Sequence, residues 1–480
     1  KTNDAFIHRR IIMLGYILLK KNSQMKKLPV YIITLFGLFI TNAVFAQKQN
    51  PPAGGTPKDF VLPSKKQGSL PNGMRTTMVQ YGEIPKVYVS LMIKTGAVHE
   101  AADQVWLSDL LASLMNEGTT SMSAQALAKK AASMGGEINV NAGTDQFTIS
   151  GSALSEYAPE LVKMIADVAI NPLLPASEID RLRNDLKRQL AVDKGVPQSI
   201  AQEKFFQVMY GNSPYGRVYP TEEMLNRYTL DAVKKFYNDN IGAKRSVLYV
   251  AGKFDEASTS KAVTENFSKW KSGAAASYPS PDNSVTAGTT IINRKNAPQT
   301  TVLIGLPTIT PKNPDYLPVT IMNALLGGSF ASRITSNIRE NKGYTYSPFS
   351  TFSTHPNAGV WYEQADITSE HTIDALNEIK KEITRLQSEA PGTEELAGIQ
   401  RYAAGIFVLQ NSTPNGIIGQ LNFLDLYGLD DSYLTNRVKN IYAVTPQQVT
   451  DLTKKYFLSD KMAVVMVGDE DAIKQQQAKQ

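Results

Sequence analysis

The sequence predicts an α+β fold of two homologous α/β-sandwich domains, each an antiparallel-rich sheet packed with helices. Alternating apolar residues typical of a strand open each half, at 87–93 and 300–306, and helical patterns follow. Landmarks also recur at one offset. Gly252 and Gly468 end similar apolar strands 216 residues apart, and turns at Pro197 and Pro414 lie 217 residues apart. Two landmarks at one offset indicate an internal duplication, and strands followed by helix pairs are typical of α+β sandwiches.

Residues 272–288 are rich in Gly, Ala, Ser and Pro without an apolar period, which is typical of a linker. We therefore predict five segments. They are an upstream extension with a signal peptide at 1–46, a mature N-terminal segment at 47–65, an N-terminal domain at 66–271, the linker, and a C-terminal domain at 289–475. Helices are expected over 178–196, 230–237, 394–413 and 447–457, and a hairpin over 138–150.

The start of the chain predicts export. Met25-Lys26-Lys27 precedes an uncharged apolar run at 28–45 that ends before Ala46, as in a signal peptide cleaved after Ala46. The alternative is an uncleaved membrane anchor, since the run just reaches the length of a span. Residues 1–24 begin with Lys1 and are interpreted as translated from upstream of the true start. We expect the mature chain in the periplasm of a Gram-negative bacterium, with membrane contact only through the leader.

Charge and cysteine content exclude two classes of function. Residues 1–46 hold seven Lys or Arg against one acid, Asp4, and this accounts for the whole formal net charge of +6. The rest of the chain is balanced, so its charge does not predict nucleic-acid binding. There is no cysteine, and therefore neither a disulfide nor a catalytic thiolate.

One helical segment at 107–116 follows the run Gly96-Ala97-Val98-His99-Glu100 and ends in Glu117-Gly118-Thr119. Its helical wheel places leucines on one face and Asp109, Ala112 and Ser113 on the other. The arrangement resembles the pitrilysin/insulinase-type (inverzincin) zinc peptidases, in the branch that contains mitochondrial processing peptidase. In that family this helix carries an HxxEH motif.

The resemblance implies a replaced metal site. The two metal histidine positions hold Asp109 and Ser113, the catalytic glutamate position holds Ala112, and the third ligand position holds Gln189. Zinc needs imidazole nitrogens or ionised oxygens, and hydrolysis needs a general base. We therefore expect no metal and no catalytic residue in this chain. The alternative, another cation bound by Asp109 and Gln189, offers too few charged ligands.

The remaining histidines do not form a second metal motif. After the leader they are His99, His355 and His371, widely separated and without HxxxH or HExxH spacing. We interpret them as surface or structural residues.

A second motif lies in the other half. Gly327-Gly328-Ser329-Phe330 precedes the run Arg339-Glu340-Asn341-Lys342-Gly343-Tyr344-Thr345-Tyr346. It resembles the family's substrate-binding signature, in which an Arg and a Tyr reach across a cavity to the zinc site of another domain. These roles fall on Arg339 and Tyr346, with Tyr344 as the competing tyrosine. A guanidinium and a phenol can both donate hydrogen bonds to a carbonyl or an oxyanion.

The resemblance covers roughly residues 66–472 and implies a LuxS/processing-peptidase-like metallohydrolase fold. It also implies a non-catalytic, substrate-binding subunit of a heterodimeric zinc peptidase that acts on short or unfolded peptides. Zinc is then expected in a partner chain that bears HxxEH. The competing hypothesis is a non-enzymatic scaffold or peptide-binding protein of the cell envelope.

Overall fold

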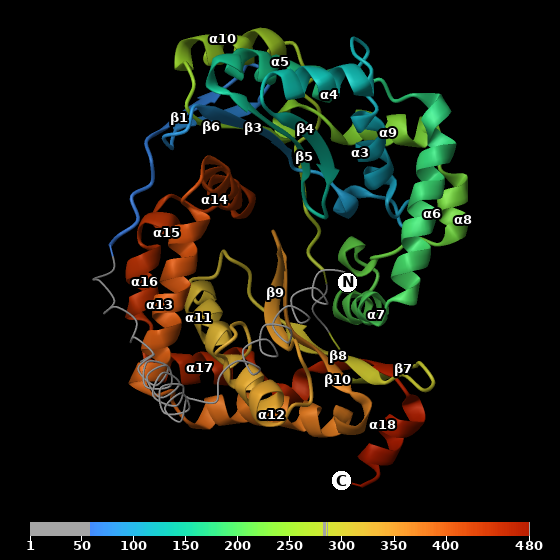
Figure 1. The fold of residues 1–480 in the computed structure, drawn as a ribbon, viewed down its shortest axis with the longest axis vertical. Helices are drawn as coiled ribbons and strands as arrows, with labels where there is room; N and C mark the ends of the chain where they lie inside the picture. The colour runs from blue at the N-terminus through green and yellow to red at the C-terminus, as the bar shows by residue number, and fades with distance from the viewer. Residues whose placement is uncertain (1–57, 282–284, 286, 480) are drawn as a thin grey trace, which may run out of the picture. The chain divides into compact units, whose positions relative to one another are not determined.

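The computed structural model describes residues 58–281, 285 and 287–479, which belong to one compact unit (Figure 1). The predicted signal peptide and most of the segment at 47–65 lie outside the described residues. In the part that is described, no helix has the length and apolar character needed to cross a bilayer.

The first half contains a six-stranded sheet in the order β1-β2-β6-β3-β5-β4. Strands β2 and β6 run parallel, and the other neighbouring pairs run antiparallel. β4 and β5 form the expected hairpin. The strands are β1 (Lys65–Ser69), β2 (Arg75–Gln80), β3 (Lys86–Ile93), β4 (Glu137–Ala142), β5 (Phe147–Leu154) and β6 (Ser246–Gly252).

The second half repeats this order as β7-β11-β8-β10-β9, and among its described residues no strand corresponds to β1. β7 and β11 are again the parallel pair, and the remaining neighbours are antiparallel. The common strand order confirms the predicted α+β architecture of two similar, antiparallel-rich sheets. The strands are β7 (Gly288–Asn293), β8 (Gln299–Pro307), β9 (Phe349–His355), β10 (Ala358–Thr368) and β11 (Ala463–Gly468).

The helices also recur in order, and the four predicted from sequence are present. The first half has α3 (Leu107–Asn116), α4 (Ala124–Ser133), α5 (Ala158–Ile170), α6 (Ile179–Gly195), α7 (Pro197–Tyr210), α8 (Glu222–Arg227), α9 (Leu230–Asn240) and α10 (Glu256–Phe267). The second has α11 (Tyr316–Leu326), the π-helix η6 (Thr335–Asn341), α12 (Thr372–Ser388), α13 (Thr393–Gln410), α14 (Pro414–Tyr427), α15 (Ser432–Thr435), α16 (Arg437–Ala443), α17 (Pro446–Tyr456) and α18 (Glu470–Gln477).

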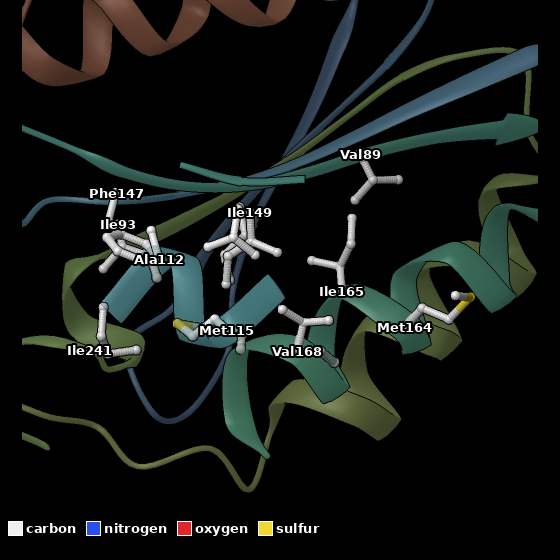
Figure 2. Packing of buried hydrophobic residues seen from close by; sticks show 14 of the residues in the cluster. Val89, Ile93, Ala112, Met115, Phe147, Ile149, Met164, Ile165, Val168 and Ile241 are labelled. Atoms are coloured by element: carbon white, nitrogen blue, oxygen red, sulfur yellow. The ribbon is translucent and has the colours of Figure 1, made fainter. Parts of the chain in front are cut away.

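Each sheet has a main core on one face. α5 and α10 cover the first sheet, and their apolar residues join those of α3 in one buried cluster (Figures 1 and 2). α11, α12 and α17 supply the corresponding cluster on the second sheet. Burying apolar surface of this kind stabilises a fold by roughly 25 cal/mol per Å².

The opposite face of each sheet is covered by a helix from the other half. Phe205 and Met209 of α7 pack against Leu303 of β8 and Val465 of β11. In return, α14 packs against the first sheet, where its residues 417–421 contact β6. The two halves therefore complete each other's cores through exchanged helices.

A buried polar contact also joins the halves. Asp145, in the turn between β4 and β5, accepts a hydrogen bond from the Tyr215 hydroxyl at 2.9 Å. Its other oxygen lies 2.6 Å from Nδ1 of His355, at the end of β9. The rings of Tyr215 and His355 stack at 3.9 Å between centroids. Asp145 and His355 are each only 9 % exposed, so His355 without Asp145 would be a buried polar group that has lost its partner.

We predict that Asp145→Ala lowers the free energy of unfolding by about 3 kcal/mol, because it leaves His355 and Tyr215 without their buried acceptor. Urea unfolding at pH 7 measures the loss. Asp239→Ala, which removes an exposed carboxylate paired with Lys235 on the same helix, serves as the control and should change stability by less than about 0.5 kcal/mol. Equal effects of the two substitutions would contradict a joining role for Asp145.

Candidate functional site

Helix α3 is well formed around the positions that the family resemblance assigns to a metal site. Leu107, Leu110, Leu111 and Leu114 are fully buried. Ahead of the helix, the Glu100 carboxylate accepts hydrogen bonds from the Trp106 amide at 3.0 Å and from the Ser108 amide and hydroxyl at 2.7 and 2.6 Å. These contacts fix the first turn, whose amides have no partner inside the helix. Burial raises the pKa of Glu100 to about 7 despite these donors.

Asp109 is at the first of the two positions where the family resemblance predicts a metal-binding histidine. It is half-buried and lines a cavity of about 300 Å³ together with Trp106, Tyr210 and Tyr215. Burial raises the pKa of this carboxyl to about 6. Burial dominates this pKa, and no positively charged side chain is among its causes.

The other replaced positions make ordinary structural contacts. The Ser113 hydroxyl donates to the Asp109 carbonyl at 2.9 Å, and the Gln189 amide donates to Asp193 at 3.1 Å. Ala112 departs from the helical-wheel expectation. It is only 6 % exposed and lies with Ile93 and Phe147 in the apolar core (Figure 2), because the wheel does not account for the sheet that packs against this side of α3.

Across the residues that the structure describes, no group of three or more His, Cys, Asp or Glu side chains could hold a metal ion. The histidines make separate contacts: His99 Nε2 lies 3.0 Å from the Ser277 carbonyl, His355 pairs with Asp145, and His371 stacks on Tyr344. The donor set on α3 and α6 therefore does not fit zinc.

The glycine turn, Gly327-Gly328-Ser329-Phe330, begins where α11 ends. The amides of Gly327 and Gly328 both donate to the Asn323 carbonyl, at 2.9 and 2.8 Å. Ser329 is buried, whereas Phe330 is 67 % exposed. The turn thus holds one large aromatic ring at the surface.

Arg339, on η6, lies between this ring and a second one. Its guanidinium carbon is 4.5 Å from the ring centroid of Phe330 and 4.8 Å from that of Tyr346. Such contacts hold a cation without neutralising it. The Glu340 carboxylate lies 3.3 Å from Arg339 Nε and is half exposed, so solvent weakens this ion pair.

The two tyrosines of the motif point to different surroundings. Tyr346 is 77 % exposed and stacks on Arg339. Tyr344 stacks on His371 at 4.3 Å between centroids and packs against the second core. The structure thus brings together Phe330, Arg339 and Tyr346, and it separates Tyr344 from them.

Sequence reasoning missed the polar side chains beneath the glycine turn, Asn323, Ser350 and Glu363. All three are buried. The available signal was Glu363, an acid that directly follows the apolar run Val360-Trp361-Tyr362 of β10, where an acid is rarely buried without a reason.

Comparison with known proteins identifies the family. Residues 77–220 match the domain described as Insulinase (Peptidase family M16), and residues 227–402 match the one described as Peptidase M16 inactive domain. The chain belongs to peptidase family M16.

Individual relatives agree with this assignment. The chain is 23 % identical to the uncharacterized zinc protease YmxG of Bacillus subtilis, over 82 % of its own length and 96 % of that protein. The peptidase M16 inactive domain structure from Pseudomonas fluorescens shares its fold with a TM-score of 0.78 and 23 % identity, covering 84 % of this chain and 98 % of that one. A chain of Complex III2 from Candida albicans does so with a TM-score of 0.70 and 16 % identity, covering 84 % and 95 %.

We predict that Asp109→Asn stabilises the protein at high pH. A carboxyl whose folded pKa is raised contributes stability that is present below its unfolded pKa and is lost as pH rises through about 6. At pH 8 the variant should therefore gain up to about 3 kcal/mol over the native chain, with a smaller gain at pH 4.5. Urea unfolding at both pH values measures this, with the exposed Asp103→Asn as control. A gain independent of pH would refute the burial of a charged Asp109.

We also predict that metal binding can be restored. Replacing Asp109 and Ser113 with His and Gln189 with Glu supplies the three ligands that the family resemblance places on α3 and α6, and three protein ligands suffice for zinc. The triple variant should retain about one zinc per chain after dialysis, measured by metal analysis. The double variant that keeps Gln189 is the matched control. A folded triple variant without zinc would show that these helices do not have the ligand geometry.

Proposed function

We propose that this M16 chain is the non-catalytic, substrate-binding subunit of a heterodimeric zinc peptidase. A partner chain of the same family with HxxEH would supply the zinc and the general base, and this chain would donate Arg339 and Tyr346 to the hydrolysis of short or unfolded peptides. The proposal includes the periplasm as the location.

The observation that carries the proposal is the contrast between the two motifs. On α3 the metal ligands and the base are replaced by Asp109, Ser113 and Ala112, while the second motif holds Arg339 between the exposed rings of Phe330 and Tyr346. A charged guanidinium held by rings has lost little of its capacity to bind a carbonyl or an oxyanion. The same arrangement has no evident value for packing, because both rings are mostly exposed.

The names of the relatives indicate which reaction the proposed complex would carry out. YmxG is named a zinc protease, so peptide hydrolysis is a reaction of the wider family. A chain that keeps the fold and lacks the metal ligands can take part in that reaction through its binding surface.

The alternative is a scaffold that assembles with partners without activity. The fold likeness to a chain of Complex III2 favours it, but it does not explain a half-buried guanidinium held between two exposed rings. Isolating the chain from its own cells, identifying the proteins that accompany it, and assaying the complex on an unstructured peptide separates the two functions. Stable assembly without cleavage would support the scaffold.

We predict that Arg339→Ala lowers kcat/KM of the isolated complex about 100-fold, because a charged donor to the developing oxyanion is lost. The assay is cleavage of the same unstructured peptide, with circular dichroism to confirm folding. Arg227→Ala is the matched control, since Arg227 is an exposed arginine that pairs with Glu223 on its own helix. Unchanged cleavage by the folded Arg339→Ala complex would overturn the role assigned to Arg339.

A further inference from the structure

Glu363 is a carboxyl group sealed inside the second core. It is fully buried, and neither of its oxygens makes a hydrogen bond of normal geometry, although the Ser350 hydroxyl lies close enough to oppose part of the effect of burial on its pKa. It lies on β10 directly opposite Ser350 of β9 and Ile304 of β8. Burial raises its pKa well above the ordinary value, as expected for an acid with no cation beside it.

The glycine turn lies directly against Glu363 and Ser350. A Cβ atom added to Gly327 would lie 2.5 Å from Glu363 Oε2 and 2.6 Å from Ser350 Oγ. The Ser350 amide also donates to the Gly327 carbonyl at 3.1 Å. The absence of a side chain at Gly327 is therefore what lets the turn approach Glu363 so closely.

Hydrogen-bond directions around Asn323 fix the proton positions. The Trp361 indole can only donate, so the Asn323 side-chain atom 2.5 Å from it must be the oxygen. That oxygen also receives the Ser350 hydroxyl at 2.7 Å. The single hydroxyl hydrogen of Ser350 is thus committed to Asn323, and only its lone pairs remain for Glu363.

A carboxylate cannot bond to those lone pairs, whereas a carboxylic acid can donate to them. We propose that Glu363 is a protonated positioning residue, which supports the glycine turn through Ser350 and Asn323 and so sets the place of Phe330 beside Arg339. The chain of donors runs from the Glu363 acid to Ser350 and on to the side-chain oxygen of Asn323. The main-chain carbonyl of the same Asn323 accepts from the amides of Gly327 and Gly328.

The neighbours of Glu363 offer no competing explanation. β8 places Ile304 opposite it, β9 places Ser350, and Gly327 approaches it at the end of α11. None of these side chains carries a charge. The inference rests on the proposed function for its link to peptide binding, but its structural part can be tested on the chain alone.

The first experiment follows stability against pH. Because the folded pKa of Glu363 is raised, its contribution is present below the unfolded pKa, near 4.5, and is lost as pH rises towards the folded value. Glu363→Gln stays neutral, so its unfolding equilibrium constant should diverge from that of the native chain by up to about tenfold per pH unit above this point. Glu137→Gln, at an exposed strand position on β4, is the control. A pH-independent difference would overturn the proposal.

The second experiment observes the turn itself. Hydrogen exchange of the segment 323–331 should become at least about tenfold faster in Glu363→Ala and remain near the native rate in Glu363→Gln, which restores a neutral donor. A general loss of protection spread over the second half, or no rescue by glutamine, would show a packing role only.

Peptide cleavage by the complex completes the test. Glu363→Ala should raise KM several-fold at pH 7, while Glu363→Gln stays within about twofold of the native value. Faster exchange at the turn without any change in cleavage would refute the link to peptide binding and leave the positioning of the turn intact. If Arg339→Ala also leaves cleavage unchanged, the proposed function itself fails.

Discussion

The exchange of α7 and α14 is the constraint on which the rest of the structure depends. Each sheet has a second apolar face that its own half does not cover, and the helix that buries it comes from the other half. The apolar surface of one half is therefore fully buried only when the other half is folded against it. Polar groups caught between them must then find partners inside the protein, and Asp145 and His355 do so with each other.

The same reasoning applies to α3, whose place in the fold does not require a bound metal. Its position is set by a leucine face in the first core and by the Glu100 carboxylate at its first turn, and neither depends on the side chains at the former ligand positions. Asp109, at one of the positions that the resemblance assigns to a metal ligand, is a half-buried acid with a raised pKa. An acid in that condition is a stability cost at neutral pH.

Much of the architecture followed from sequence because it depends on local periodicity. The strands at 87–93 and 300–306, the long helices and the repeat offset all rest on apolar spacing, and they are present as expected. The exchange of α7 and α14 could not be predicted from the sequence, since an apolar helical face fits either sheet equally well. Nor could the surroundings of Ala112, the contact of Asp145 with His355 across 210 residues, or the residues under the glycine turn, because partners distant in the chain leave no mark in local spacing.

The surface and the interior of the glycine-turn region use charge in opposite ways. At the surface Arg339 keeps its charge, because the rings of Phe330 and Tyr346 hold it through their faces and Glu340 is screened by water. Below the same turn, an ionised Glu363 would be a negative charge in a medium of low dielectric, where it acts over longer distances than a solvated one. A proton on Glu363 removes that negative charge. It also supplies a hydrogen-bond donor for the lone pairs of the Ser350 hydroxyl. The neutral Glu363 supports the turn from below, and the two aromatic rings hold Arg339 above it. Both contacts keep a positive group in a fixed place beside the turn.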